Sequence, residues 1–587
     1  MIHAPRSRLA FLFAGAMWGV LVLGLAAAGW LGARGVAAYG HLASAQAMVA
    51  AATAEIDDPS LALTALARVG AETAEARSLT SDPVWRLAEG LPWVGPQFAA
   101  VAQVTAAIDD AASRAFEPLS VASTGLSADT LRPVDGAIDV ARIAAVAPAA
   151  EAAASTLRRA ADDVAGIDRA PLLGKLADAV DRSQHLLDTA AATADALQRA
   201  TRLVPRMLGS AGPRSTLILF ENNAEWRSLG GVVGAVAQLD THEGRMALTA
   251  QASTVDFATL SHETPVDVLP DEVRTIFDTR PARYIQNATQ VPDFAIGAPL
   301  AREMWRKLRA TSVDSVVALD PVTLSYLLRA TGPVRLPSGD ELDADTVVPL
   351  LLNDVYRRFP DPLQQDAFFQ SAAVAVFQAL AEGRADPSLL IDAIERAGAE
   401  RRLLVWNADA ADQAVLDGTT FQGGLPRSDP ARTTVGVYLN DGTGSKMDYY
   451  LRPEIETAWC TDDTASVHVE LHNQAPDPAA LPVYVTGGGE YGVPVGDALT
   501  GVYVYLPPGA ELIDRRTTSQ GAVAPGFAGG TQDGHQVVKW SVQLGPGQSG
   551  QLDLEVRMPR TPVLDAVSTP TRDSADIPRT GFCRFDG

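Results

Sequence analysis

The pattern of apolar and polar positions separates the N-terminal end of the chain from everything that follows. Residues 9–33 are 25 consecutive uncharged and almost entirely apolar positions, preceded by Arg6 and Arg8. A helix of this length, rising about 1.5 Å per residue, exceeds the roughly 30 Å hydrocarbon core of a bilayer. The pattern therefore predicts a transmembrane helix over residues 9–33, preceded by a cytoplasmic tail of residues 1–8.

The flanking arginines favour an N-terminus that stays in the cytoplasm. The alternative is a cleaved signal peptide, whose apolar stretch spans about 7 to 15 residues and ends in small residues. Residues 26–28 are alanines, but the apolar run continues through Trp30 and Leu31, and no later segment has membrane-spanning length. We expect a single-pass protein of the cytoplasmic membrane, with its C-terminal bulk extracytoplasmic.

Residues 34–210 form an alanine-rich region with a helical pattern that prolines interrupt repeatedly. Its clearest repeat alternates steps of three and four residues, which is the spacing of a heptad seam. The repeat comprises Leu173, Leu176, Val180, Ser183, Leu187, Ala190, Ala194 and Leu197. We expect a helical bundle or stalk with this seam in its own core; the alternative is a coiled coil with a partner.

The pattern changes after residue 212, where apolar runs of strand length alternate with helical periodicity. We expect strands at residues 215–220, 232–239, 315–319 and 403–406, and helices at residues 300–309, 321–330, 344–381 and 388–397. Strands that alternate with helices predict an α/β or α+β core over residues 213–430.

Beyond residue 431 the helical signal disappears. Short alternating segments, at residues 433–439, 466–471, 501–506, 537–544 and 551–556, are separated by Gly, Pro, Asp and Asn. Short strands at such spacing predict a C-terminal β-sandwich over residues 431–561. We expect residues 562–587 to form a loose tail that is tied back through Cys583.

The charge balance limits the partners. The chain has 47 basic and 70 acidic residues, a formal net charge of −23. Such a charge argues against nucleic acid as a partner, and any anionic ligand requires a local cationic pocket.

The chain has two cysteines, Cys460 and Cys583, both in the half that the predicted topology exports. Oxidising surroundings favour a disulfide between them. Two free thiols are the alternative, because a sequence does not show whether the two α-carbons approach one another.

The segment after the first predicted strand of the core is the richest in polar groups. Asn222, Asn223, Glu225 and Arg227 are expected in a loop at the carboxyl end of that strand, where α/β sheets gather ligands. Two glycines follow and permit close approach of a ligand or another strand. In the alternative, purely structural interpretation the asparagines form a turn and Glu225 pairs with Arg227.

Several ordered motifs resemble a known family. The first reads Asn-Asn-Ala-Glu-x-Arg-x-x-Gly-Gly over residues 222–231, and the others lie at residues 291–294, 317–321, 328–334, 353–361, 446–451 and 481–485. Together they resemble the bacterial domain of unknown function 4012. The resemblance implies a membrane-anchored envelope protein, with envelope proteins or a cell-wall glycopolymer as partners.

Residues 315–336 are also similar to the LytR-CpsA-Psr family, which transfers glycopolymers from polyprenyl-pyrophosphate carriers to peptidoglycan. That likeness implies arginines that hold pyrophosphate and acids that handle a proton and a divalent cation, the one cofactor it would add. The candidates by residue type are Arg227, Arg357 and Arg358 for phosphate, and Asp293 and Asp320 as acids.

Other chemistry finds little support. No histidine or cysteine lies between Glu263 and Trp459, which argues against a hydrolytic triad in the core, and no zinc, calcium or nucleotide motif occurs. We therefore predict no metal site and name no catalytic residue. The expected function is binding or scaffolding in envelope organisation, and the alternative is a glycopolymer transferase that uses a polyprenyl-pyrophosphate-linked donor.

Overall fold

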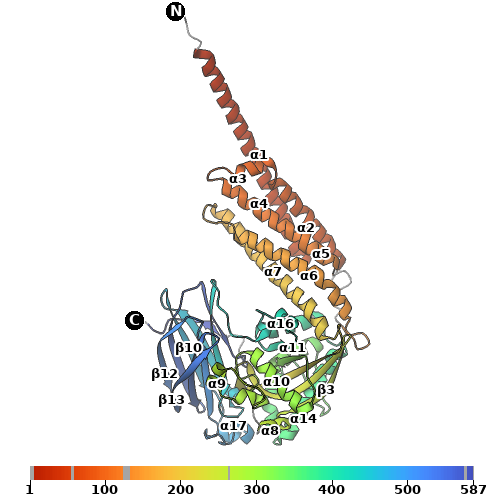
Figure 1. Cartoon of the computed structure of the whole chain (residues 1–587), viewed down its shortest axis with the longest axis vertical. Coiled ribbons are helices and arrows are strands. Elements are labelled where there is room, and N and C mark those ends of the chain that lie inside the picture. The colour runs from red at the N-terminus through yellow and green to blue at the C-terminus, as the bar shows by residue number, and fades with distance from the viewer. Residues whose placement is uncertain (1–5, 55–58, 123–131, 262–264, 574–577, 586–587) are drawn as a thin grey trace, which may run out of the picture. The chain divides into compact units, whose positions relative to one another are not determined.

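The computed structural model describes residues 6–54, 59–122, 132–261, 265–573 and 578–585. Helices account for 47% and strands for 25% of the structure, so the chain combines helical and sheet regions. It divides into two compact units, one of residues 1–130 and 140–205 and one of residues 131–139 and 206–587 (Figure 1). Of the predicted cytoplasmic tail, residues 1–5 lie outside the described residues.

The first unit is helical in its described part, and its long helices lie side by side (Figure 1). Its elements are α1 (Arg6–Ala54), α2 (Pro59–Thr80), α3 (Pro83–Glu89), α4 (Gly95–Asp110), the π-helical η1 (Ala111–Phe116), α5 (Glu117–Ala122), α6 (Val140–Ala165) and α7 (Gly174–Met207). The sequence predicts this helical character.

Small side chains hold the bundle together. Its largest core is made chiefly of alanines from α4, α6 and α7, together with residues such as Leu157. Val180, Leu187 and Ala194 of the heptad repeat are buried in that core, whereas Leu173 at its start is 71% exposed. The repeat therefore packs the chain against itself, as expected.

Two helices bear on the question of a membrane span. The predicted span, residues 9–33, lies within one continuous helix, α1. Among the described residues, the helix that is long and apolar enough to cross a membrane is α6, Val140–Ala165. One face of α6 is buried in the bundle, through residues such as Val146 and Leu157, as in the core helix of a soluble protein.

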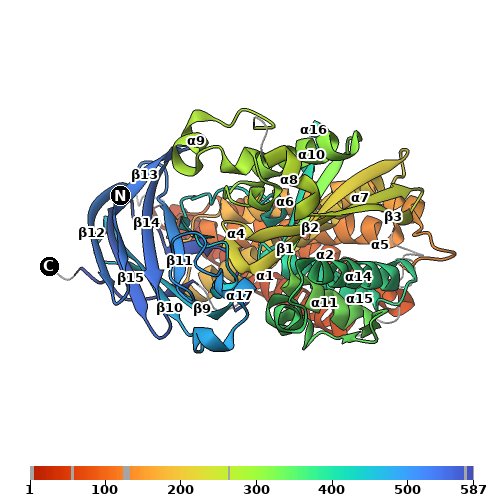
Figure 2. The same ribbon diagram turned by 90° about the horizontal axis from the view of Figure 1, so that it is seen from below.

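The second unit begins with a mixed sheet of strand order β3-β2-β1-β4-β7. Its strands are β1 (Arg214–Arg227), β2 (Gly230–His242), β3 (Arg245–Ser253), β4 (Ser315–Leu319) and β7 (Leu403–Asn407). Only the β1/β4 pairing is parallel. Leu217 and Leu219 of β1 and Val316 of β4 bury one face against α10, and Figure 2 shows α14 on the opposite side of β1 and β2.

The remaining elements of this part cover the sheet or connect its strands. They are η3 (Thr254–Phe257), α8 (Ala258–Ser261), α9 (Asp271–Phe277), η4 (Arg280–Ala282), η5 (Ile285–Asn287), α10 (Phe294–Arg309), α11 (Pro321–Thr331), β5 (Val334–Arg335), β6 (Glu341–Leu342), α12 (Val347–Pro349), the π-helical η6 (Leu350–Asp354), α13 (Val355–Arg358), α14 (Pro362–Ala381), α15 (Pro387–Ala399), α16 (Ala410–Val415) and η7 (Thr420–Gln422).

The helix expected over residues 344–381 is interrupted. The chain leaves helical geometry at Phe359, whose φ of −121° and ψ of 97° are extended, and α14 starts at Pro362. Pro360 follows directly, and a residue before proline is pushed out of the α region. The single long helix was therefore a wrong prediction.

Two five-stranded sheets follow, ordered β12-β15-β10-β9-β17 and β13-β14-β11-β8-β16. Their alternating apolar residues share one hydrophobic core, which includes Val467, Val502, Trp540 and Leu554. The strands are β8 (Arg432–Asp441), β9 (Leu451–Trp459), β10 (Thr464–Asn473), β11 (Ala498–Tyr505), β12 (Glu511–Ser519), β13 (Val523–Gln532), β14 (His535–Leu544), β15 (Ser549–Arg557), β16 (Val563–Ser568) and β17 (Arg579–Thr580), and the short helices are η8 (Met447–Tyr450), η9 (Pro478–Ala480) and α17 (Val483–Thr486).

The structure contains the tie through Cys583 that was predicted for residues 562–587, but it corrects the prediction that this tail is otherwise loose. β16 pairs in parallel with β8, and β17 pairs in parallel with β9. A disulfide joins Cys460, which follows β9, to Cys583, which follows β17, with 5.1 Å between the α-carbons. Backbone pairing and a covalent bond thus hold the C-terminal segment against the two sheets.

Candidate functional site

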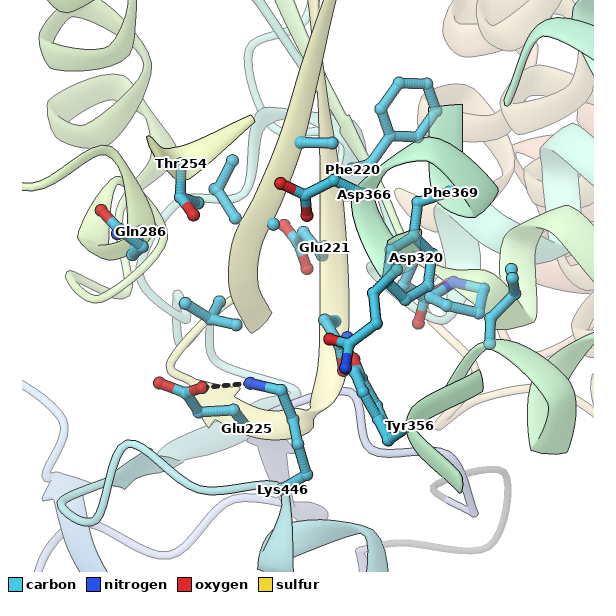
Figure 3. A pocket seen from close by; sticks show the side chains of 18 of the residues that line it. Phe220, Glu221, Glu225, Thr254, Gln286, Asp320, Tyr356, Asp366, Phe369 and Lys446 are labelled. Carbon is cyan, nitrogen blue, oxygen red and sulfur yellow. Dashed lines mark hydrogen bonds and ion pairs between the residues drawn. The ribbon is translucent and has the colours of Figure 1, made fainter. Parts of the chain in front are cut away.

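A cavity of about 600 Å³ lies beside the second half of β1 (Figure 3). We call it the β1 cavity. Its walls come from β1 and β2, the start of α11, α14, and residues 444–446 and 483–491. Its volume is within the range of small-molecule sites, about 300 to 1,000 Å³. Its described lining includes the charged or ionisable groups Glu221, Glu225, Asp320, Asp366, Glu490 and Lys446 and the aromatic rings of Phe220, Tyr356, Phe369, Tyr484 and Tyr491.

Residues 221–227, expected in a loop, are part of β1. The strand continues to Arg227, with irregular pairing to β2 between Asn222 and Trp226. The two glycines serve this pairing. A Cβ on Gly230, where φ is +148°, would lie 2.1 Å from Glu221 Oε2, and one on Gly231 would lie 2.3 Å from the backbone of Asn222. The glycines therefore permit close approach of the neighbouring strand.

Glu225 lies between two cations. Its Oε1 accepts a hydrogen bond from Arg227 Nη2 at 3.0 Å, and its Oε2 accepts one from Lys446 Nζ at 2.5 Å. All three side chains are at most 10% exposed. Burial alone would raise the pKa of Glu225, but Lys446 and Arg227 outweigh burial and lower it. The structural interpretation of the Glu225–Arg227 pair is thus the one found, with Lys446 as an additional partner.

Arg227 has partners for each of its guanidinium nitrogens. Its Nε donates to Asn287 Oδ1 at 2.9 Å, and its Nη1 donates to the Trp226 carbonyl oxygen at 2.8 Å. With Nη2 held by Glu225, this guanidinium group is committed to the protein. An arginine so engaged is not available as a receptor for phosphate.

Asp320 has a second buried ion pair. It caps α11 by accepting from the Thr323 backbone N–H at 2.8 Å, and it pairs with Arg402 Nη1 at 2.6 Å. Asn223 Nδ2 donates to Asp320 at 3.1 Å and to the Pro570 carbonyl oxygen at 2.9 Å. Arg402 also donates to the Thr571 carbonyl oxygen, at 2.6 Å. These contacts fasten the segment after β16 to the first sheet.

Glu221 differs from these two carboxylates. It is 5% exposed, its Oε2 accepts from the Gly231 N–H at 3.1 Å, and its Oε1 has no hydrogen-bond partner among the described residues. Burial and the nearby Asp320 raise its pKa well above the usual value, against smaller opposing effects of Gly231 and Arg402. A buried polar group without a partner costs about 1 to 3 kcal/mol. The fold therefore carries an unfavourable group at the wall of the cavity.

Of the other candidate residues named from the sequence, one lines the cavity and three lie elsewhere. Asn222 lines the cavity and donates to the Tyr356 hydroxyl at 2.5 Å. Asp293 lies elsewhere, where it caps α10 through the Ala295 N–H at 2.9 Å. Arg357 and Arg358 are exposed on α13, and Arg358 pairs with Asp340 at 3.0 Å. Asp293, Arg357 and Arg358 are thus not part of this site.

Sequence reasoning missed four residues that shape the site. Glu221, Tyr356 and Lys446 line the cavity, and Arg402 lies behind Asp320. Lys446 carried a signal, because it is one of only four lysines in the chain. Its partner Glu225 is 221 residues away, so no local pattern could join them.

The described residues contain no cluster of three or more His, Cys, Asp or Glu side chains that could hold a metal ion. Comparison with family models matches residues 211–356 to a family described as a protein of unknown function, DUF4012. Residues 211–356 belong to the DUF4012 family. This DUF4012 region contains β1, β2, the whole of α11 and the start of α13, and therefore much of the cavity wall.

The comparisons extend no further than this family. No curated protein and no solved structure matches the chain. The similarity of residues 315–336 to the LytR-CpsA-Psr family is not shown by any of them.

Proposed function

We propose that this protein is anchored in the cytoplasmic membrane by α1, lies mainly outside the cytoplasm, and acts in cell-envelope organisation by binding a ligand in the β1 cavity. In this proposal its two C-terminal sheets form a β-sandwich that supports the cavity. The observation that carries the binding role is the buried carboxyl group of Glu221 in the wall of a ligand-sized cavity, with one oxygen that no described residue contacts by a hydrogen bond.

The disulfide supports an extracytoplasmic location. Cys460 and Cys583 are bonded, and such bonds persist in oxidising compartments. The bond holds the C-terminal segment against the two sheets that adjoin the β1 cavity. The disulfide and the cavity are therefore proposed to lie on the same, extracytoplasmic side of the membrane.

The exposed apolar side chains of α1 support the anchor. Val22, Leu25 and Trp30 are 58%, 66% and 52% exposed. Leu31, in contrast, is buried with Trp85 in a small core of the bundle, and Arg34 pairs with Asp82 at 3.0 Å. Apolar residues that no part of the chain covers are favourable in lipid. The proposed span therefore ends near Trp30, slightly before the end expected from the sequence.

The transferase alternative has less support. A pyrophosphate-linked donor requires cationic groups that are available to phosphate oxygens. Lys446 is the only cationic residue in the described lining, and it is paired with Glu225. Arg227 and Arg402 are also held by protein carboxylates. Binding of a ligand that is not anionic fits these observations better.

Protease treatment of intact spheroplasts tests the topology. We expect cleavage of the region after Arg34 and retention of α1 in the membrane fraction. A matched sample with permeabilised membranes shows whether the protease is able to reach both sides. Protection in intact spheroplasts, or a mature N-terminus near Gly29, would contradict the anchored and outward-facing arrangement.

A further inference from the structure

The carboxyl group of Glu221 is held in one place by the pairing of β1 with β2. Glu221 lies opposite Val233 in the register, and its Oε2 accepts from the Gly231 N–H at 3.1 Å. Gly230 leaves the room that this carboxyl group occupies, since a Cβ there would lie 2.1 Å from Oε2. The second oxygen, Oε1, has no partner in the described part of the chain. Figure 3 shows Glu221 among the side chains that line the cavity.

The described lining of the cavity has more acidic than basic side chains. Glu225 and Asp320 are balanced by the buried cations Lys446, Arg227 and Arg402. Three further acidic side chains of the lining form no ion pair within the described residues: the buried Glu221, the half-buried Asp366 and the exposed Glu490. This arrangement favours a cation over an anion, because a cation pairs with the carboxylate form that burial of Glu221 and Asp366 otherwise disfavours.

The aromatic side chains indicate the kind of cation. Lys446 Nζ lies 5.6 Å from the centroid of the Tyr484 ring, so this wall already faces one ammonium group. Tyr491, in the same wall, is 69% exposed. Aromatic faces attract organic cations, and they pack against the apolar body of such a ligand. A bare metal ion is a poorer match, because the described residues hold no cluster of three metal-ligating side chains.

We propose that the β1 cavity binds an organic ammonium ion, a small ligand whose protonated amine pairs with Glu221 and whose body contacts Tyr484 and Tyr491. This inference rests on the binding role proposed above and specifies the chemical class of the ligand. Glu225 does not fill the same role, because Lys446 and Arg227 already occupy its two oxygens.

The pairing couples binding to protonation. Burial and Asp320 raise the pKa of Glu221 more than Gly231 and Arg402 lower it, so its surroundings in the protein favour the neutral acid. An ammonium ion favours the ionised carboxylate and hence drives release of the proton to solvent. Affinity is therefore expected to increase as pH rises towards the raised pKa of Glu221.

Titration calorimetry on the full chain in detergent micelles tests the proposal. The probes are cyclohexylammonium and glucosamine, with cyclohexanol and glucose as neutral counterparts and inorganic pyrophosphate as the anion. We expect the two amines to bind with release of a proton, seen as a binding enthalpy that depends on the ionisation enthalpy of the buffer. Glu221→Gln, whose amide oxygen still accepts from Gly231, is expected to weaken amine binding by about tenfold or more.

Glu395→Gln is the matched control, because Glu395 is exposed on α15, outside the cavity lining, and this variant should bind as the unaltered protein does. If Glu221→Gln does not fold, proton release by the unaltered protein decides the question. Equal binding of amines and neutral counterparts, or binding of pyrophosphate, overturns the ammonium assignment and leaves a binding role standing. No binding of any probe at about 10 mM overturns both.

Discussion

The Nζ atom of Lys446 lies 2.5 Å from Oε2 of Glu225, and this contact joins β1 of the first sheet to the segment between β8 and β9. Both side chains are at most 10% exposed. Burial lowers the pKa of Lys446, but Glu225 together with Tyr484 and Tyr356 outweighs burial and raises it, so the amine stays charged. The DUF4012 region and the C-terminal sheets are therefore linked by charge at the wall of the β1 cavity.

Replacement of Lys446 by Met is expected to destabilise the protein. The replacement removes one of the two cations that pair with the buried Glu225, and breaking a buried ion pair costs about 3 to 5 kcal/mol. Chemical denaturation would measure the change in the free energy of unfolding. Lys307→Met, at an exposed position of α10, is the control and should change it little. Equal stability of the two variants would show that the buried pair is unimportant.

Replacement of Arg227 by Ala should act on stability in a similar way. The guanidinium group contacts Glu225, Asn287 and a backbone carbonyl, and its loss leaves these groups unsatisfied. We expect a cost of about 3 to 5 kcal/mol, and only partial recovery with Arg227→Lys, because an ammonium group lacks the planar fork. Thermal unfolding measures the stability of Arg227→Ala and Arg227→Lys. Arg335→Ala is the control, since the side chain of Arg335 is 76% exposed. A stable Arg227→Ala protein that has lost function would instead indicate a ligand contact.

The disulfide gives a third prediction. Cys460 and Cys583 are 123 residues apart, and closing a loop of that size is worth about 4 to 5 kcal/mol by chain entropy. Mass spectrometry without reduction should find one linked peptide pair. Cys460→Ser, Cys583→Ser and the double variant should unfold at the same, lower denaturant concentration. Two alkylatable thiols in freshly exported protein would refute the bond.

Stability should depend on pH through Asp441. Burial and Glu225 raise its pKa from 3.8 to about 6, against Arg227 and hydrogen bonds from Thr443. The folded state therefore binds the proton more tightly than the unfolded state does. The contribution of protonated Asp441 to stability is complete below pH 3.8, the pKa of this group in the unfolded chain. It is lost as pH rises from 3.8 through about 6, the pKa of Asp441 in the folded protein.

Denaturation at several pH values tests this dependence. Asp441→Asn removes a group that binds up to one more proton in the folded state than in the unfolded state. The slope of the free energy of unfolding against pH should therefore change by up to about 1.4 kcal/mol per pH unit. Asp271→Asn, at a side chain that is 87% exposed, is the matched control. An unchanged slope in Asp441→Asn would contradict a raised pKa in the folded protein.

Local sequence patterns predicted much of the architecture because they depend on short-range physics. The helical region, the strands near residues 215–220 and 315–319, and the short alternating strands beyond residue 431 all appear in the structure. Their burial follows from apolar spacing alone. The predicted helix over residues 344–381 was wrong because Pro360 and Pro362 outweigh its apolar pattern.

The site depended on contacts that no local pattern contains. The sequence pointed to Asn222, Asn223, Glu225, Arg227 and Asp320, and these residues do gather at or behind the β1 cavity. Asp293, Arg357 and Arg358 have the same residue types, yet they lie elsewhere, because residue type alone does not place a side chain.

By itself, the sequence determined the helical and sheet regions, the membership of residues 211–356 in the DUF4012 family, and the pair of cysteines available for a bond. Only the tertiary structure decided that Arg227 pairs with Glu225 and that Lys446 and Arg402 complete the buried ion pairs. It also decided that one oxygen of Glu221 has no hydrogen-bond partner among the residues that the structure describes. The physical reason is distance along the chain. Charge pairing in a buried site is settled by groups that lie up to 221 residues apart, and only folding brings them within hydrogen-bond range.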